Sequence, residues 1–83
     1  MTILKLSKKG REGNQETFFT TKNPYNLEDN EIIKVRKWYE TNSDEVIQYD
    51  IFKKNGSIYG GNHIKERVNT LPADIILIKG EIL

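Results

Sequence analysis

The chain has no cysteine, one histidine (His63) and one alanine (Ala73) among its 83 residues. Without cysteine, a disulfide framework, thiolate chemistry and a zinc–thiolate site are all excluded. A lone histidine also excludes every metal motif that needs two histidines, and it leaves one base for any nucleophile–histidine pair. We therefore interpret His63 as a surface or capping residue. We predict that the protein is not an enzyme and that it uses no metal or cofactor.

Long apolar segments are missing as well. No segment approaches the length of a membrane span, and the short apolar run in MTILKLSKKG is too brief for the core of a signal peptide. We therefore expect a cytoplasmic protein without a membrane partner, and we interpret NGS at 55–57 as a turn rather than a glycosylation site. Scarce alanine with abundant isoleucine, lysine and asparagine is typical of AT-rich genomes, as in many low-GC bacteria and their phages.

Positive and negative charges nearly balance, and the formal net charge is +1. This balance excludes a strongly acidic nucleic-acid mimic, and it lacks the basic excess of a protein that coats DNA by charge alone. The charges nevertheless occur in blocks. Residues 1–11 contain four cations and no acid, whereas residues 28–31 contain three acids. Such blocks indicate polarised faces rather than one basic groove.

The apolar residues that are present form clusters that can build a core, and we expect residues 1–83 to be a single domain. Segments 2–6 and 16–21 have the composition of strands. The glycines and charges of SKKGREGN, residues 7–14, predict a wide basic loop between them. Residues 22–30 then form a polar connection.

The segment IIKVRKWYE, residues 32–40, fits neither a helical nor a strand period cleanly. As a helix, it places Ile32, Val35 and Tyr39 on one face. As a strand, it places Lys34, Arg36 and Trp38 on the same face. The β-rich segment 45–53 follows after a turn-rich connection, and a hairpin between the two segments satisfies both backbones. We therefore favour the strand.

The C-terminal half predicts a turn, a strand, a helix and a last strand. Asn55-Gly56 suits a type I′ turn that leads into a short strand over 57–60. Asn62 is a candidate N-cap, and Pro72 ends the amphipathic helix that we expect between them. The apolar face of this helix consists of Ile64, Val68 and Leu71. The continuous apolar run DIILIKGEIL, residues 74–83, predicts a central strand that is buried on both faces.

Together these segments predict an α+β fold. We expect a small antiparallel sheet of about five strands, arranged as a meander, with one short helix near the C-terminus packed on it.

The middle segment supplies the first set of candidate binding residues. It consists of Lys34, Arg36, Lys37, Trp38 and Tyr39. Tryptophan, tyrosine and arginine are the residues most enriched in interface hot spots. The same cations can neutralise phosphates. The aromatic rings of this segment could then stack on unpaired bases, and Phe18 or Phe19 could enlarge this stacking surface. The alternative is that Trp38 is a core residue and the cations form a solvated edge.

The stretch YGGNHIKER supplies a second candidate set, for anion binding. Its residues are Gly60, Gly61, Asn62 and Lys65. Glycines allow close approach of the backbone, and a helix that begins here would point free N–H groups at a ligand. Lys65 and Arg67 would add positive charge. The stretch matches neither the phosphate-binding loop nor the dinucleotide fingerprint, so a simple turn remains the alternative.

These observations predict a small protein-binding module that regulates or inhibits a larger intracellular protein. If the AT-rich composition reflects a phage or another mobile element, a host-directed inhibitor is the natural form of this function. The alternative is a single-stranded nucleic-acid-binding domain. It would use the 34–38 face and take a second phosphate contact from the basic segment 5–11.

Overall fold

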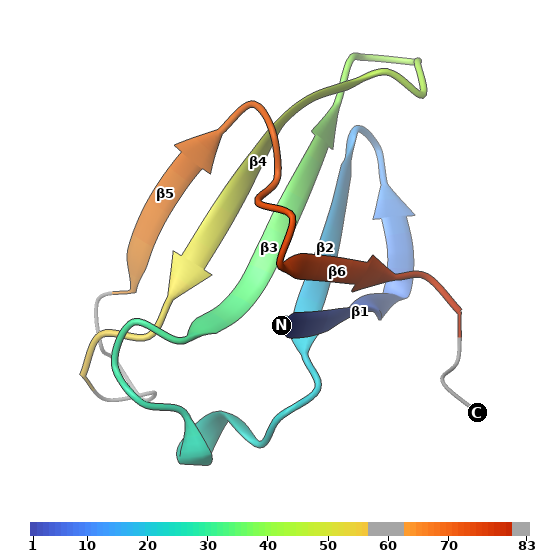
Figure 1. Ribbon diagram of the computed structural model, residues 1–83. Helices are drawn as coiled ribbons and strands as arrows, with labels where there is room; N and C mark the ends of the chain where they lie inside the picture. Colours follow the sequence, from blue (N-terminus) through green and yellow to red (C-terminus); the bar gives the residue numbers. More distant parts are fainter. Residues whose placement is uncertain (57–62, 81–83) are drawn as a thin grey trace.

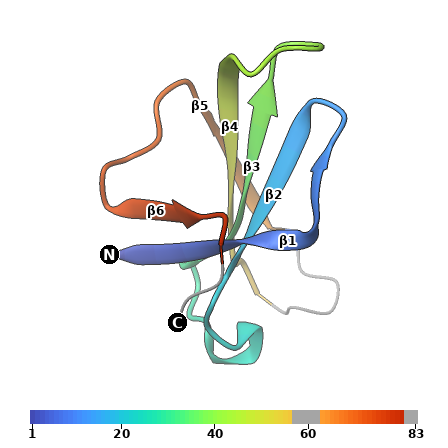
Figure 2. The same ribbon diagram turned by 90° about the vertical axis from the view of Figure 1, so that its right-hand side faces the viewer.

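The computed structural model describes residues 1–56 and 63–80, and this part of the chain is almost entirely β (Figure 1). The elements, in chain order, are β1 (Thr2–Glu12), β2 (Gln15–Thr20), the 3-10 turn η1 (Pro24–Asn26), β3 (Ile32–Tyr39), β4 (Val46–Lys53), β5 (Ile64–Val68) and β6 (Ile75–Ile78). The strands form one six-stranded sheet in the order β5-β4-β3-β2-β1-β6. The sheet curls into an open half-barrel with β5 and β6 at its edges (Figures 1 and 2).

The strands from β1 to β5 form an antiparallel meander, whose fifth strand is not the one expected from the sequence. Each pairs with its neighbour in the sequence. The last strand departs from this pattern, because the chain returns from β5 to the opposite edge and β6 lies parallel to β1, with Ile76 opposite Ile3. The sheet is therefore mixed rather than purely antiparallel.

The core lies on the inner face of the curl. It consists of the buried side chains Leu4, Phe18, Val35, Ile51 and Ile75. Phe18, Val35 and Ile51 occupy paired positions on β2, β3 and β4, so their side chains pack directly across the sheet. Because successive side chains of a strand alternate between faces, this inner row forces the residues between them onto the outer face.

The strand predictions for segments 2–6, 16–21, 32–40 and 45–53 are confirmed by β1, β2, β3 and β4. The predicted loop over 7–14 is wrong for most of its length. β1 continues to Glu12, and its end pairs with the start of β2. A hairpin ladder satisfies backbone groups without apolar burial, so this charged, exposed part of the strand carries no hydrophobic pattern in the sequence.

The predicted C-terminal helix is also wrong, and with it the α+β fold class. Ile64–Val68 is the strand β5, which pairs antiparallel with β4. A spacing of four residues, as between Ile64 and Val68, places two side chains on one face of a strand as well as of a helix. A short isolated helix is marginal in water, whereas β5 satisfies the free backbone edge of β4. The strand expected over 57–60 and the N-cap Asn62 lie outside the described residues.

The last apolar run is not a central strand. β6 pairs with β1 and, among the described strands, forms an edge of the sheet. Ile75 is buried in the core, while Ile76 on the opposite face is 37% exposed. The apolar run therefore covers one end of the half-barrel on a single face instead of being enclosed on both.

Candidate functional site

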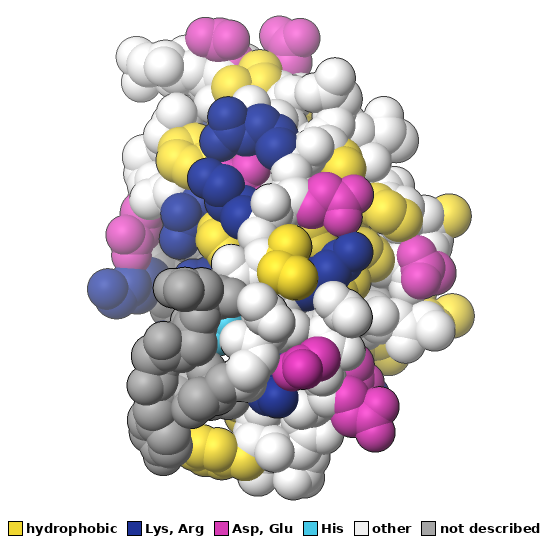
Figure 3. Space-filling model, turned by 90° about the vertical axis from the view of Figure 1, so that its left-hand side faces the viewer, with side chains coloured by type: hydrophobic (Ala, Val, Ile, Leu, Met, Phe, Trp, Pro, Cys, Tyr) yellow, Lys and Arg dark blue, Asp and Glu magenta, His cyan; other side chains and the backbone are white. Residues whose placement is uncertain are grey.

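The outer face of the sheet carries cations and aromatic rings that strand pairing places side by side. One row across β2 to β5 consists of Thr17, Arg36, Asp50 and Arg67. The next row consists of Phe19, Lys34, Phe52 and Lys65. We use the term basic face for Lys34, Arg36, Trp38, Phe52, Lys65 and Arg67. Figure 3, which looks onto the β5 side of the molecule, shows lysine and arginine side chains gathered close together.

Aromatic rings contact two cations of this face, Lys34 and Arg36. The guanidinium carbon of Arg36 lies 5.9 Å from the centre of the Trp38 ring and 5.4 Å from the centre of the Phe52 ring. The ammonium of Lys34 lies 4.7 Å from the same Phe52 ring. Such contacts attract a cation to the electron-rich face of a ring. Lys34 and Arg36 are therefore pre-positioned rather than free in solvent.

One buried carboxylate anchors the neighbouring part of the face. Asp50 is only 2% exposed, and it accepts hydrogen bonds from Nε1 of Trp38 at 2.9 Å and from Nε of Arg67 at 3.0 Å. Burial raises the pKa of Asp50, but the hydrogen bonds from Arg67 and Trp38 outweigh burial, so its pKa lies below the ordinary value. The hydrogen bond between Arg67 and Asp50 also raises the pKa of Arg67. Asp50 therefore fixes Trp38 and Arg67 from beneath.

Lys34 and Arg36 are adjacent cations that lack a counter-charge among the described residues. Burial, and then the charge of Arg36, lower the pKa of Lys34. Within residues 1–56 and 63–80, neither cation has a carboxylate within ion-pair distance. In addition, Nε of Arg36 is buried and has no hydrogen-bond partner there. Two adjacent cations that repel each other favour an external anion.

The structure divides the first predicted set between the two faces. Lys34, Arg36 and Trp38 share the outer face, as the strand interpretation of this segment requires. Trp38 is half-buried, so it is neither a core residue nor fully exposed. Lys37 and Tyr39 belong to a different environment, where the Lys37 ammonium lies 5.3 Å from the centre of the Tyr39 ring. Strand alternation thus separates residues that are adjacent in the sequence.

Tyr39 belongs to a cluster that stabilises the fold. Its side chain is buried, and its hydroxyl donates a hydrogen bond to the buried carboxylate of Glu16. Lys79 lies 3.4 Å from the same carboxylate, and the guanidinium of Arg11 lies 4.0 Å from the centre of the Tyr39 ring. We therefore assign Tyr39 a structural role rather than a place on the binding surface.

Only part of the second predicted set lies among the described residues. Lys65 lies on β5 opposite Phe52 and joins the basic face. Gly60, Gly61 and Asn62 lie outside the described residues. Because residues 64–68 form a strand, the helix N-terminus on which the anion-site prediction was based is absent from this part of the chain.

Sequence reasoning missed Asp50 and Phe52, and it considered Arg67 only as added charge for the anion site. Asp50 and Phe52 alternate with the core residue Ile51, so the period-two pattern of β4 already places them on its outer face. Arg67 has no such signal, because its position depends on β5 pairing with β4. Phe19, one of the two phenylalanines considered for this surface, is on the outer face, while Phe18 is in the core.

No protein-family model, curated protein or solved structure matches this chain. In the described parts of the chain, no three side chains gather in a way that could hold a metal ion, and no helix is long and apolar enough to cross a membrane. The inference of function therefore depends on the residues of the basic face.

Proposed function

We propose that the protein is a small cytoplasmic binding module that regulates or inhibits a larger protein by contacting an acidic segment of it through the basic face. The supporting observation is the pair Lys34 and Arg36. They lie side by side, partly buried and held by rings, and no carboxylate of the described chain neutralises them. An acidic partner supplies the missing charge.

The arrangement of the rings favours a protein partner over a single strand of nucleic acid. Stacking of successive bases requires several open ring faces. Here Arg36 covers the rings of Trp38 and Phe52, and Lys34 lies over Phe52 as well. Phe19, at 44% exposure, is the most open ring in the two rows. Carboxylates need no ring, and arginine binds them through paired charge-assisted hydrogen bonds.

The rigidity of the face also suits protein recognition. A side chain that is already held in its bound position loses little conformational entropy on binding. The contacts of Arg36 with two rings and of Arg67 with Asp50 restrict side chains that are otherwise flexible. Arginine and tryptophan in such settings are frequent hot spots.

Affinity capture tests this proposal. Immobilised protein is incubated with a lysate of a low-GC bacterium, and the retained proteins are identified by mass spectrometry. We expect Lys65→Glu and Arg36→Glu to lose a partner that the wild type retains. Lys8→Glu is the matched control, because Lys8 is exposed, lies outside the basic face and undergoes the same change in charge. A set of retained proteins that is identical for all four proteins contradicts the proposal.

Nucleic acid as the partner makes a different prediction. Fluorescence anisotropy with labelled single-stranded oligonucleotides would show an affinity that falls steeply as salt is raised and that is lost in Arg36→Ala. Absence of binding at low salt would eliminate this alternative.

A further inference from the structure

A large bulge in β1 creates a hollow beside the basic face. Leu6 pairs with Phe18, and the next paired position joins Arg11 to Glu16. The four β1 residues 7–10 therefore lie opposite Thr17 alone. Gly10 in this bulge has a φ of +66°, a backbone conformation that glycine adopts without strain. Bulges of this kind bend a strand away from its neighbour and are frequent beside functional sites.

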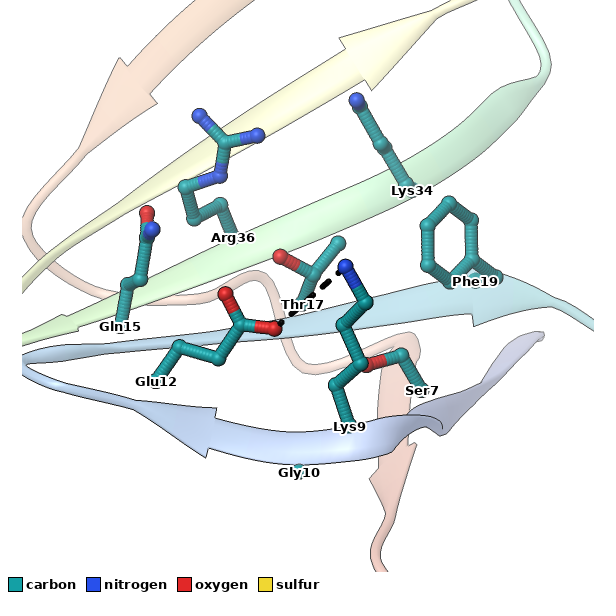
Figure 4. Close-up of a pocket in the computed structure, with 9 residues that line it drawn as sticks. All are labelled: Ser7, Lys9, Gly10, Glu12, Gln15, Thr17, Phe19, Lys34 and Arg36. Atoms are coloured by element: carbon teal, nitrogen blue, oxygen red, sulfur yellow. Dashed lines mark ion pairs between the residues drawn. The ribbon is translucent and has the colours of Figure 1, made fainter.

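The hollow lies between the bulge and the outer surface of β2 and β3 (Figure 4). Thr17 of β2 lies at its base and Phe19 of β2 at one end, while Lys34 and Arg36 of β3 stand on the side opposite the bulge. Its volume is about 340 Å³. This is at the lower end of the range of about 300–1,000 Å³ that is usual for sites of small organic ligands.

The charges around the hollow favour an anion. The cations in its lining are Lys9, Lys34 and Arg36. The carboxylate of Glu12 also lines it, but this group lies 3.8 Å from the Lys9 ammonium, which offsets it. Lys34 and Arg36 therefore present uncompensated positive charge to the space between the strands.

The remaining lining determines what the anion should carry. The Phe19 ring is 44% exposed and offers a flat apolar wall at one end. Ser7, Gln15 and Thr17 offer neutral groups that can donate and accept hydrogen bonds. An acidic side chain of a protein would use the cations and leave both of these features without a contact. A ligand with a negative group, a flat ring and a polar ring edge uses all three.

We propose that this hollow binds a nucleoside monophosphate, with its phosphate at Lys34 and Arg36 and its base against Phe19. One nucleotide fits the lining better than a track of bases, since the neighbouring rings of Trp38 and Phe52 are covered by Arg36. This site goes beyond the binding of an acidic protein, because it requires no protein partner. The two ligands share Lys34 and Arg36, so a bound nucleotide competes with the acidic segment.

Calorimetric titrations with AMP, adenosine and inorganic phosphate test the proposal. We expect AMP to bind more tightly than either of the others, because adenosine lacks the charge and phosphate lacks the ring. In a parallel NMR titration, the amide shifts should cluster at Thr17, Phe19, Lys34 and Arg36. AMP that binds no better than phosphate, or that shifts amides elsewhere, overturns the proposal.

Two variants and one control locate the ligand. Phe19→Ala should weaken AMP binding about tenfold, the size expected for the loss of one base–ring stack, and should leave phosphate binding unchanged. Lys9→Gln should weaken the binding of both AMP and phosphate. Lys65→Gln is the control, because Lys65 is on the basic face but outside the lining of the hollow. An equal loss of AMP binding in Lys65→Gln and Lys9→Gln places the ligand elsewhere and overturns the proposal.

The nucleotide has two possible sources, a free molecule or one unit of a single strand. Titration with a short oligoadenylate distinguishes them. Oligoadenylate binding that is weakened by Phe19→Ala identifies the strand, whereas binding of AMP alone identifies the free nucleotide, and both results support the site. Because Lys65→Glu impairs the proposed protein contact but leaves the hollow intact, failure of one proposal is separable from failure of the other.

Discussion

The indole nitrogen of Trp38 donates a hydrogen bond to Asp50 at 2.9 Å, from β3 to the neighbouring strand β4. The same carboxylate accepts a hydrogen bond from Arg67 on β5 at 3.0 Å. One buried anion on β4 thus holds side chains from both flanking strands, β3 and β5, in place beneath the basic face.

Trp38→Phe keeps an aromatic ring next to Arg36 but removes the N–H donor. We expect a loss of about 1–2 kcal/mol in the free energy of unfolding, because the buried Asp50 loses a hydrogen-bond partner and a smaller ring leaves space behind. Urea denaturation measures this change. The exposed ring of Phe19 provides the comparison, and Phe19→Leu should stay within about 0.5 kcal/mol of wild type. Equal stability of Trp38→Phe and wild type would show that the hydrogen bond is dispensable.

Acidification should destabilise the protein through Asp50. Although burial raises its pKa, the hydrogen bonds from Arg67 and Trp38 bring the folded-state pKa below the unfolded value of about 3.9. The stabilisation is therefore present above about pH 4 and is lost as the pH falls through the folded-state pKa.

Urea denaturation at a series of pH values measures this effect. Asp50→Asn should be less stable than wild type at neutral pH and should show a shallower decline in acid. Asp74→Asn is the control, because Asp74 is exposed and its carboxylate takes part in none of the ion pairs of the described residues, and this variant should retain the wild-type decline. An unchanged acid decline in Asp50→Asn would refute the assignment to Asp50.

Tyr39→Phe tests the division between structural and binding residues. Removing the hydroxyl takes a hydrogen bond from the buried carboxylate of Glu16 and leaves its contact with Lys79, so we expect a loss of about 1–3 kcal/mol in the free energy of unfolding. Partner capture by the folded variant should equal that of wild type, because Tyr39 is not on the basic face. Loss of the partner without loss of stability would return Tyr39 to the binding surface.

Gly10→Ala should be destabilising for a reason that involves the backbone alone. The added methyl group meets open space, because no described heavy atom beyond Gly10 and its two chain neighbours lies within 4 Å, but the φ of +66° is unfavourable for alanine and costs roughly 1–2 kcal/mol. Gly10→Asn should cost less, because asparagine tolerates this conformation. The midpoint of thermal unfolding is measured for both variants. Gly80→Ala is the control, because space around Gly80 is also open and its φ is outside the positive region. Equal effects at Gly10 and Gly80 would contradict the prediction.

The sequence was sufficient to predict the outer face of β3. Alternation alone places Lys34, Arg36 and Trp38 together once this segment is a strand, and the β-rich segment after the turn made the strand the better choice. It was not sufficient to identify what lies beside them. Phe52 and Arg67 reach the basic face through the register of β4 and β5, which depends on backbone pairing between distant segments.

The errors in the fold have the same physical origin. Ile64 and Val68 share a face in both a helix and a strand, and only the unpaired edge of β4 decides between the two. The end of β1 is charged and exposed, so nothing in its composition distinguishes a hairpin strand from a loop. In both cases the deciding interactions are hydrogen bonds to the backbone of another segment, which side-chain patterns do not report.

Partner capture by wild type and Lys65→Glu, side by side and with Lys8→Glu as the matched control, tests directly whether the basic face recognises an acidic protein. We predict a protein that is retained by wild type and by Lys8→Glu and is lost from Lys65→Glu. Retention of the same proteins by all three would contradict the proposed role of this face.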